Sequence, residues 1–236
     1  MGGGWQAVGV DRRLLLEDDL TRSAVVANSA MNRGRQLAGV NSYTRELGFN
    51  PLDQVRSAAG RGRHGGWLYL CCGTGRALLQ AARSMRGERV ALVGVDLVDY
   101  FDPIDDVDLP VKLVCASVTS WVPARRFDLI TCVHGLHYIG DKLAVLTRAA
   151  SWLTDDGLLV ADLDLTSIRL PDGRPAGRAL AGALRQAGFR YDARRRRITS
   201  EGRREVSLPY DYLGADDKAG PNYTNQPAVH SYYQPR

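Results

Sequence analysis

Two histidines that stand three residues apart are the side chains best suited to proton transfer in this sequence. His134 and His137 lie in the stretch CVHGLHY, directly after an apolar run. The ordinary pKa of histidine, about 6.5, suits a general base near neutral pH. Both are therefore candidate catalytic residues, and the alternative is that they are hydrogen-bonded structural histidines. The pair supplies only two ligands where a catalytic zinc takes about three from the protein, so no metal site is predicted.

A short glycine turn and a later aspartate form a second chemical pattern. Gly73 and Gly75 flank Thr74 after the apolar stretch WLYLCC, and glycines there let backbone amides approach a ligand closely. Asp96 follows 21 residues beyond Gly75, at the end of another apolar run, where a carboxylate can accept both hydroxyls of a ribose. A dinucleotide fingerprint would need Gly or Ala at the position of Leu78, so no nicotinamide or flavin site is predicted. The alternative is that the glycines only shape the turn and Asp96 caps a helix.

Short apolar runs that alternate with helix-like segments must position these groups. The expected strands are 67–72, 89–95, 110–116, 127–133 and 157–163, and the expected helices between them include 76–85 and 142–153. The apolar runs are continuous, as in strands that helices cover on both faces. The alternation predicts a parallel, doubly wound α/β sheet. The glycine turn and His134 would then lie at the carboxyl ends of strands, where ligands bind in such sheets.

The segments on either side of this alternation differ from it. Residues 11–36 carry apolar side chains at three- and four-residue steps, which predicts one or two helices, and 52–59 predicts another. Beyond the fifth strand we expect a helix over 178–186, then a hairpin of strands 189–199 and 205–213 around a turn at 200–202. The expected organisation is an N-terminal helical cover over 1–60, a core over 61–213 and a C-terminal tail or lid over 214–236.

Composition and charge exclude several classes of protein. Hydrophobic residues make up 44% and charged residues 24% of the 236 positions, as in globular domains and unlike fibrous or disordered chains. No apolar run approaches the roughly 20 residues of a membrane span and no signal peptide is recognisable, so a cytoplasmic location is expected. The four cysteines lack CxxC spacing and are expected to be reduced thiols.

Residues 67–163, and more loosely the chain up to 213, resemble the class I S-adenosylmethionine-dependent methyltransferases. The resemblance is carried by two glycines of the GxGxG turn, the ribose-binding acid and the FD pair of the fourth strand, which are here Gly73, Gly75, Asp96, Phe127 and Asp128. The acid and first glycine of the family turn are replaced by Tyr69 and Cys71. The resemblance implies a mostly parallel, seven-stranded Rossmann-like sheet, antiparallel C-terminal strands, and S-adenosylmethionine as cofactor.

The resemblance also implies which residues bind that cofactor. They come from the glycine turn, the ends of neighbouring strands and the N-terminal cover, and they are Tyr43, Tyr69, Cys71, Cys72, Gly73, Gly75, Asp96, Leu97, Ser117, Val118 and Val133. Asp96 would bind the ribose, Leu97 would pack on the adenine, and Ser117 would meet its amino group. Asn41, Ser42 and Tyr43 are candidate contacts to the methionine end.

Other side chains could contact the methyl acceptor. Asp162 and Asp164 leave the fifth strand as DLD, with both side chains on one face of an extended chain. They point toward the acceptor, or one caps a loop while the other is solvated. Four tyrosines either wall an aromatic acceptor or dock the tail, and these are Tyr138, Tyr223, Tyr232 and Tyr233.

Three functions remain open at this point. The leading hypothesis is an S-adenosylmethionine-dependent methyltransferase that acts on an O or N atom of a small-molecule acceptor. Residues 190–204 hold seven arginines against two acids, which favours a second hypothesis, an RNA methyltransferase that uses this hairpin as a phosphate contact. Tyr69 and Cys71 motivate a third, a non-catalytic binding protein that keeps the fold.

Overall fold

Five apolar segments form the parallel strands at the centre of the protein. The structure is a computed structural model in which residues 13–27, 34–40 and 42–236 are described. The parallel strands are β1 (Gly65–Leu70), β2 (Val90–Asp96), β3 (Val111–Cys115), β4 (Phe127–Cys132) and β5 (Leu153–Asp162). Every residue of β1 and β4 is buried, in agreement with their continuous apolar sequences. Each of the five runs predicted to be a strand therefore forms one.

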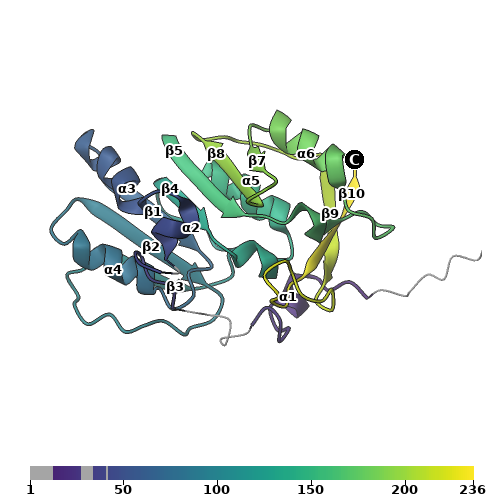
Figure 1. Cartoon of the computed structure of the whole chain (residues 1–236), viewed down its shortest axis with the longest axis horizontal. Coiled ribbons are helices and arrows are strands. Elements are labelled where there is room, and N and C mark those ends of the chain that lie inside the picture. Colours follow the sequence, from purple (N-terminus) through teal and green to yellow (C-terminus); the bar gives the residue numbers. More distant parts are fainter. Residues whose placement is uncertain (1–12, 28–33, 41) are drawn as a thin grey trace, which may run out of the picture.

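The sheet has seven strands in the order β3-β2-β1-β4-β5-β8-β7 (Figure 1). The chain moves outward from β1 to β3, then crosses to β4 on the other side of β1, so the strand order reverses between β1 and β4. The last two strands, β8 (Arg197–Glu201) and β7 (Arg190–Asp192), form an antiparallel hairpin, and β8 pairs with β5. The predicted doubly wound, mostly parallel sheet with antiparallel C-terminal strands is confirmed.

Alternate residues of β1 belong to two different buried clusters. Leu68 and Leu70 lie in the cluster that includes α5 (Lys142–Ser151) and α6 (Gly177–Gln186). Trp67 and Tyr69 lie in the cluster that includes α3 (Pro51–Gly60) and α4 (Arg76–Ser84). Because successive side chains of a strand point to opposite faces, both faces of the sheet carry helices.

The hairpin turn lies earlier in the chain than expected. It falls between Asp192 and Arg197, where the Asp192 carboxylate accepts hydrogen bonds from the amides of Arg194 and Arg195 at 2.9 and 3.0 Å. The predicted turn at 200–202 is wrong, because Ser200 and Glu201 still pair with β5. The arginines 194–196 consequently lie in the turn and not in a strand.

A second, three-stranded sheet contains the segments expected to be the other half of the hairpin and the tail. It consists of β6 (Ile168–Arg169), β10 (His230–Pro235) and β9 (Tyr210–Asp216) in that order. The prediction that 205–213 pairs within the hairpin is therefore wrong, because β9 pairs with β10. The C-terminal segment thus includes a strand, and the loop between β9 and β10 is the part that remains a candidate lid.

The N-terminal region is less helical than its apolar spacing predicts. In the described parts of 11–36, one helix is present, α1 (Glu17–Leu20), where the spacing predicts one or two, and it is only four residues long. The Leu15 amide and carbonyl instead exchange hydrogen bonds of 2.8 and 2.9 Å with Ala215 of β9, and Figure 1 shows α1 beside this second sheet. Two further helices, α2 (Tyr43–Leu47) and α3, follow. No helix of the described residues is long and apolar enough to cross a membrane.

Candidate active site

The turn after β1 lies at the centre of the site. Cys71, Gly73 and Gly75 have φ angles of 57°, 58° and 73°, in the left-handed region that favours glycine. A Cβ on Gly75 would lie 2.8 Å from the terminal methyl groups of Leu113, so a side chain here would require Leu113 to move as well as a strained backbone. Asp96, at the end of β2, accepts hydrogen bonds from the Gly73 amide at 2.8 Å and from the Val98 amide at 3.2 Å. Its carboxylate therefore fastens the glycine turn to the neighbouring strand.

Cys71 carries backbone strain that a glycine would relieve. Left-handed backbone costs a residue with a Cβ roughly 1 to 2 kcal/mol, which exceeds the roughly 0.4 to 1 kcal/mol that Ala normally gains over Gly through the unfolded chain. We expect Cys71→Gly to be more stable than Cys71→Ala by about 1 kcal/mol in urea unfolding. At exposed Cys115, in strand β3, the order should reverse. Equal or higher stability of Cys71→Ala would contradict the strain.

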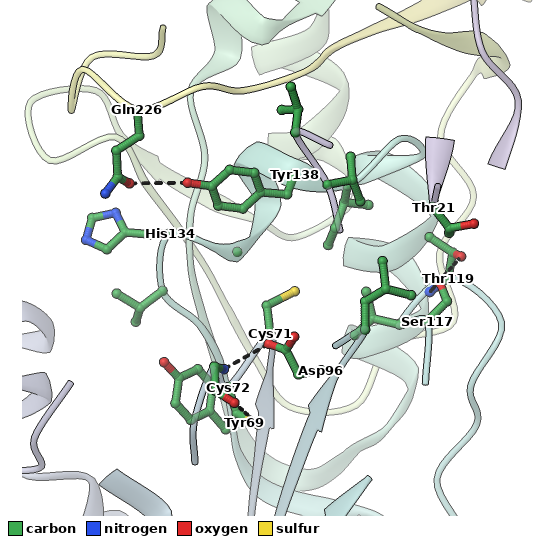
Figure 2. A pocket seen from close by; sticks show the side chains of 18 of the residues that line it. Thr21, Tyr69, Cys71, Cys72, Asp96, Ser117, Thr119, His134, Tyr138 and Gln226 are labelled. Atoms are coloured by element: carbon green, nitrogen blue, oxygen red, sulfur yellow. Dashed lines mark hydrogen bonds between the residues drawn. The ribbon is translucent and has the colours of Figure 1, made fainter. Parts of the chain in front are cut away.

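A pocket opens above this turn, at the carboxyl ends of β1, β2 and β4 (Figure 2). It brings together all the predicted site residues except Gly75 and His137, namely Tyr43, Tyr69, Cys71, Cys72, Gly73, Asp96, Leu97, Ser117, Val118, Val133 and His134. Gly75 instead is the N-cap residue that precedes helix α4, and His137 is buried beside a second hollow. Ser42 caps α2 by accepting a hydrogen bond from Arg45, and Asn41 lies outside the described residues.

Several pocket residues come from segments in which the sequence shows no motif. Glu17 of α1 accepts hydrogen bonds from the hydroxyls of Thr119 at 2.7 Å and Ser117 at 3.4 Å. Its second oxygen, Oε2, is buried and makes no hydrogen bond with any described residue. At another part of the wall, Arg35 donates to Glu46 at 3.1 Å. Sequence spacing could not predict these contacts, because they depend on how the N-terminal segment folds back over the sheet.

The loop between β9 and β10 covers part of the same pocket. Gln226 lines it and accepts a hydrogen bond of 3.3 Å from the hydroxyl of Tyr138, as Figure 2 shows. Tyr138 belongs to a short 3-10 helix, η2 (Gly135–Tyr138), that directly follows His134. The Val229 amide donates to the carbonyl of His137 in this helix at 2.9 Å. The loop is therefore tied to the element that carries both histidines.

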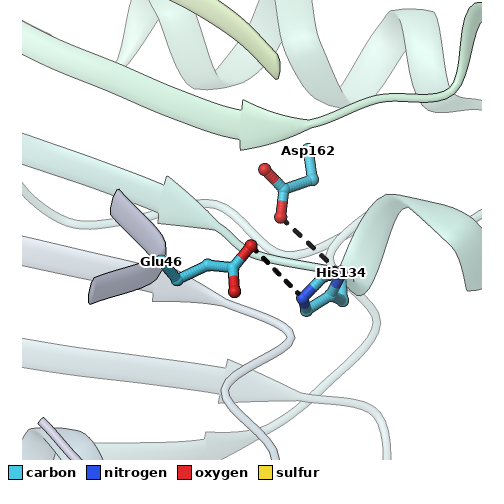
Figure 3. A group of neighbouring side chains, drawn as sticks. All are labelled: Glu46, His134 and Asp162. Carbon is cyan, nitrogen blue, oxygen red and sulfur yellow. Dashed lines mark ion pairs between the residues drawn. The ribbon is translucent and has the colours of Figure 1, made fainter. Parts of the chain in front are cut away.

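His134 lies between two carboxylates (Figure 3). Its Nδ1 is 3.7 Å from Asp162 at the end of β5, and its Nε2 is 3.7 Å from Glu46 of α2. The residue has a φ of 60°, a strained conformation that is common at functional sites. With a carboxylate oxygen 3.7 Å from each ring nitrogen, the geometry suits a side chain that exchanges a proton with a bound molecule.

Arg197 holds these carboxylates in place. Its Nε and Nη2 donate to Asp162 Oδ1 at 3.1 and 3.0 Å, and its Nη1 donates to the carbonyls of Glu46 and Leu47 at 2.8 and 3.2 Å. The side chain is 9% exposed. Arg197, the first residue of β8, thus links α2 to β5 next to His134. The interpretation of residues 190–204 as a phosphate-contacting hairpin does not predict this role.

The three groups around His134 also have the composition of a metal site. One ligand atom each of Glu46, His134 and Asp162 lies within 4.8 Å of the others. Arg197 already places a fixed positive charge 3.0 Å from Asp162 and 3.7 Å from Glu46. Because that charge repels a cation, we interpret the cluster as a network that orients His134.

The charge on Glu46 is expected to contribute to the stability of the fold. His134 first, then Arg35 and Arg197, lower the pKa of Glu46 from 4.5 to about 2, and burial opposes them. A carboxyl whose folded pKa is lowered stabilises the fold above its unfolded pKa and loses that effect as the pH falls toward the folded pKa. We expect the difference in unfolding free energy between wild type and Glu46→Gln to shrink as the pH falls from about 4.5 toward 2, in chemical denaturation. The shrinkage should be smaller in a His134→Asn background, and parallel pH curves in both backgrounds would contradict the coupling.

The fold and the site together define a class of protein, and a comparison with known families identifies the family. An open α/β sheet with a pocket at its strand ends, where the order reverses, is a Rossmann-like ligand-binding domain. Residues 45–194, more than half of the chain, match the family described as "Methyltransferase domain". The chain belongs to this family of methyltransferases, and the resemblance seen in the sequence is confirmed. The curated proteins give no match.

Solved structures similar to the chain are also methyltransferases by their descriptions. CalS10, an amino pentose methyltransferase from Micromonospora echinaspora in its SAM-bound form, is 22% identical with a TM-score of 0.35, covering 50% of this chain and 52% of that one. The sugar N-methyltransferase KedS8 from Streptoalloteichus is 21% identical with a TM-score of 0.38, covering 69% and 59%. NodS, an N-methyltransferase from Bradyrhizobium japonicum in complex with S-adenosylhomocysteine, is 16% identical with a TM-score of 0.41, covering 76% and 100%. The chain thus spans 52% and 59% of the length of the first two, and likeness at this level says nothing about its acceptor.

Proposed function

We propose that the protein binds S-adenosylmethionine in the pocket above the glycine turn and transfers its methyl group to an O or N atom of a small-molecule acceptor. The observation that carries the proposal is the buried carboxylate of Asp96, which lies at the end of β2 beside the Gly73 amide in a methyltransferase-family chain. Each carboxylate oxygen has two lone pairs, so Asp96 can hold the turn and still accept hydrogen bonds from ribose hydroxyls.

The other walls of the pocket suit the remaining parts of this cofactor. Leu97 and Val118 offer apolar surface for an adenine ring. The buried, unpartnered Oε2 of Glu17 is an acceptor for an amino group, a role that the sequence reading gives to Ser117. Arg35 offers a guanidinium to the carboxylate of the methionine end, near Tyr43. These groups complement an amino-acid nucleoside in both polarity and charge.

The protein's own part in the reaction is to orient the acceptor and remove its proton. The bound cofactor supplies the methyl group as an electrophile, so the chain needs no nucleophile of its own. His134 is the proposed general base, with one ring nitrogen taking the acceptor proton while Asp162 and Glu46 stabilise the charged ring. The covering loop with Gln226 would exclude water from the pocket.

The contacts of the arginine-rich hairpin favour a small acceptor over RNA. At least four of its seven arginines lie within 4.0 Å of a carboxylate oxygen, and these include Arg190, Arg195, Arg197 and Arg203. Because carboxylates already neutralise these arginines, they would neutralise few phosphates of a nucleic acid and release few of its counterions. The hairpin is therefore expected to attract a polyanion less strongly than its sequence implies.

Calorimetric titration with S-adenosylmethionine and with S-adenosylhomocysteine tests the proposal. We expect micromolar binding of at least one of them, followed by methyl transfer in a panel of small phenols and amines. Methylation of RNA alone, with activity lost at modest salt, would favour the nucleic-acid alternative. If neither ligand binds at millimolar concentration, the enzyme reading fails, and Tyr69 and Cys71 mark a site that has lost its cofactor.

A further inference from the structure

A second hollow lies next to the proposed cofactor pocket and shares no lining residue with it. It is formed by η2, by the short helix η3 (Leu165–Ser167) with β6, and by the loop between β9 and β10. His137 lines it, and the His137 and His134 ring centroids are 6.2 Å apart. The same loop contributes Tyr223 to this hollow and Gln226 to the cofactor pocket. A molecule bound here would therefore lie beside the proposed general base.

The walls of the hollow hold an excess of buried hydrogen-bond donors. Arg169 Nε, Arg196 Nη1 and Asn222 Nδ2 are all buried, and none forms a hydrogen bond with any described residue. The Nε2 atom of His137 is also buried and forms no hydrogen bond with any described residue. An unsatisfied buried polar group costs about 1 to 3 kcal/mol, so several in one cavity indicate a place where an acceptor-rich ligand binds.

Neighbouring contacts fix the direction of the Asn222 amide. Its Oδ1 accepts hydrogen bonds from the amide and hydroxyl of Thr224 at 2.8 and 2.6 Å, and from the Gln226 amide at 3.2 Å. An oxygen must occupy that position, because the two backbone groups can only donate. The NH₂ group is therefore left as the free end of the side chain, in the wall of the hollow.

The charges around the hollow are predominantly positive. Arg169 and Arg196 line it, against the single carboxylate of Asp164, which is 3.5 Å from Arg196 Nη1. Burial first, and then neighbouring cations, lower the pKa of His137 to about 3 and of His230 to about 4, so both rings are neutral at pH 7. Lys142 is among those cations for both rings, while Asp164 acts on both, and Asp216 on His230, in the opposite direction. The two arginines and the single carboxylate thus leave the lining of the hollow with a net positive charge.

The Arg196 guanidinium is held ready by an aromatic ring. Its Cζ lies 4.1 Å from the ring centroid of Tyr223, a stacking distance, and the same ring meets His137 edge-on at 5.3 Å. Tyr223 belongs to the covering loop and Arg196 to the hairpin turn, where its φ is 49°. Two segments far apart in the chain thus meet around one cation, and this fixes the guanidinium without using up its hydrogen-bond donors.

We propose that this hollow binds an anionic oxygen group of the methyl acceptor, a carboxylate or a phosphate, through Arg169, Arg196 and the amide of Asn222. The inference rests on the proposed function for the identity of the ligand as the acceptor. The guanidinium groups match planar or tetrahedral oxyanions, and the neutral His137 adds a hydrogen bond. The acceptor is then a small carboxylic acid or a phosphate ester. Its anionic end lies in the hollow, and the atom that receives the methyl group lies next to His134.

Nuclear magnetic resonance of the four histidines during titration with inorganic phosphate, and separately with acetate, tests the anion site at constant ionic strength. We expect the His137 and His230 ring signals to move saturably with one or both probes, and the His64 signal to stay fixed. The probe that binds more tightly tells phosphate from carboxylate. No saturable movement of His137 with either probe, up to tens of millimolar, would overturn the proposal.

Matched arginine variants distinguish a specific anion-binding site from nonspecific electrostatic attraction of the anion to the protein. Arg169→Gln and Arg196→Gln should each weaken the binding of the probe at least tenfold. Arg194→Gln, an exposed position in the same turn, should leave it unchanged. Equal losses in all three variants would mean nonspecific attraction and overturn the site. Should a Gln variant lose its fold by circular dichroism, the corresponding Lys variant keeps the charge and should still lose affinity, because it cannot form the paired contacts.

The same samples distinguish failure of this inference from failure of the proposed function. Calorimetry with S-adenosylhomocysteine reports on the cofactor pocket, where none of the three arginines lies. Cofactor binding without movement of His137 would remove the anion site and leave the methyltransferase proposal intact. Movement of His137 without cofactor binding would keep the anion site but remove its assignment to a methyl acceptor.

Discussion

Replacement of His134 by Asn is expected to lower the rate of methyl transfer by roughly 100- to 10,000-fold, the range that general-base catalysis contributes. Asn removes the basic nitrogen and tolerates the left-handed backbone that His134 adopts, so the turn into η2 should survive. The measurement is the single-turnover rate with the acceptor found in the panel, at saturating cofactor. Affinity for S-adenosylhomocysteine should change less than threefold, because the loss belongs to the chemical step.

A second histidine provides the control for this prediction. His64 lies just before β1, at the opposite end of the strand from the pocket, where the side chain of Arg125 contacts its ring and carbonyl. His64→Asn should transfer methyl groups at the wild-type rate. If His134→Asn is within threefold of wild type, then His134 only positions the acceptor, and catalysis rests on the cofactor's own reactivity.

The sequence predicts those elements of the structure that depend on local residue patterns. Continuous apolar runs indicate buried strands, and the position of Asp96 directly after one of them places its carboxylate at the edge where the glycine turn lies. Both follow from the period of a strand and from the alternation of strands with helices. The pocket contains all the predicted site residues except Gly75 and His137, and most of these are implied by the resemblance to the methyltransferases.

The rest depends on contacts between distant segments. Residues 11–36 carry apolar side chains at helical spacing, but Leu15 within them pairs with Ala215 of β9 and lies outside any helix. At the hairpin, Gly202 attracts a turn prediction, although the turn is made by Asp192, whose carboxylate caps two amides. That aspartate was the available signal, since Asp commonly opens turns by this contact.

Arg197 shows why the residues that support His134 could not be predicted from the sequence. It reads as one of four consecutive arginines, yet it alone is buried, because it begins β8 opposite Asp162. The strand register, and not the residue type, decides that Arg197 supports His134 while Arg196 turns to the neighbouring hollow. A register is set by pairing with β5, more than thirty residues earlier in the chain.

Replacement of Asp96 by Ala is expected to weaken the binding of S-adenosylmethionine roughly 10- to 150-fold. A hydrogen bond to a charged acceptor contributes about 1.5 to 3 kcal/mol, and a loss of that size corresponds to this range of affinity. Asp96 also holds the Gly73 amide at 2.8 Å, so the variant loosens the turn against which the cofactor would lie. Calorimetric titration of the variant measures the loss directly.

Two further variants separate the roles of the Asp96 charge and of its position. Asp96→Asn keeps the side-chain volume and one acceptor oxygen, so it should lose less affinity than Asp96→Ala while retaining the fold by circular dichroism. Asp99→Ala removes an exposed carboxylate three residues further along the chain and should bind the cofactor like wild type. If Asp96→Ala binds as tightly as wild type, Asp96 only fastens the glycine turn, and the ribose of the cofactor must be held by another group.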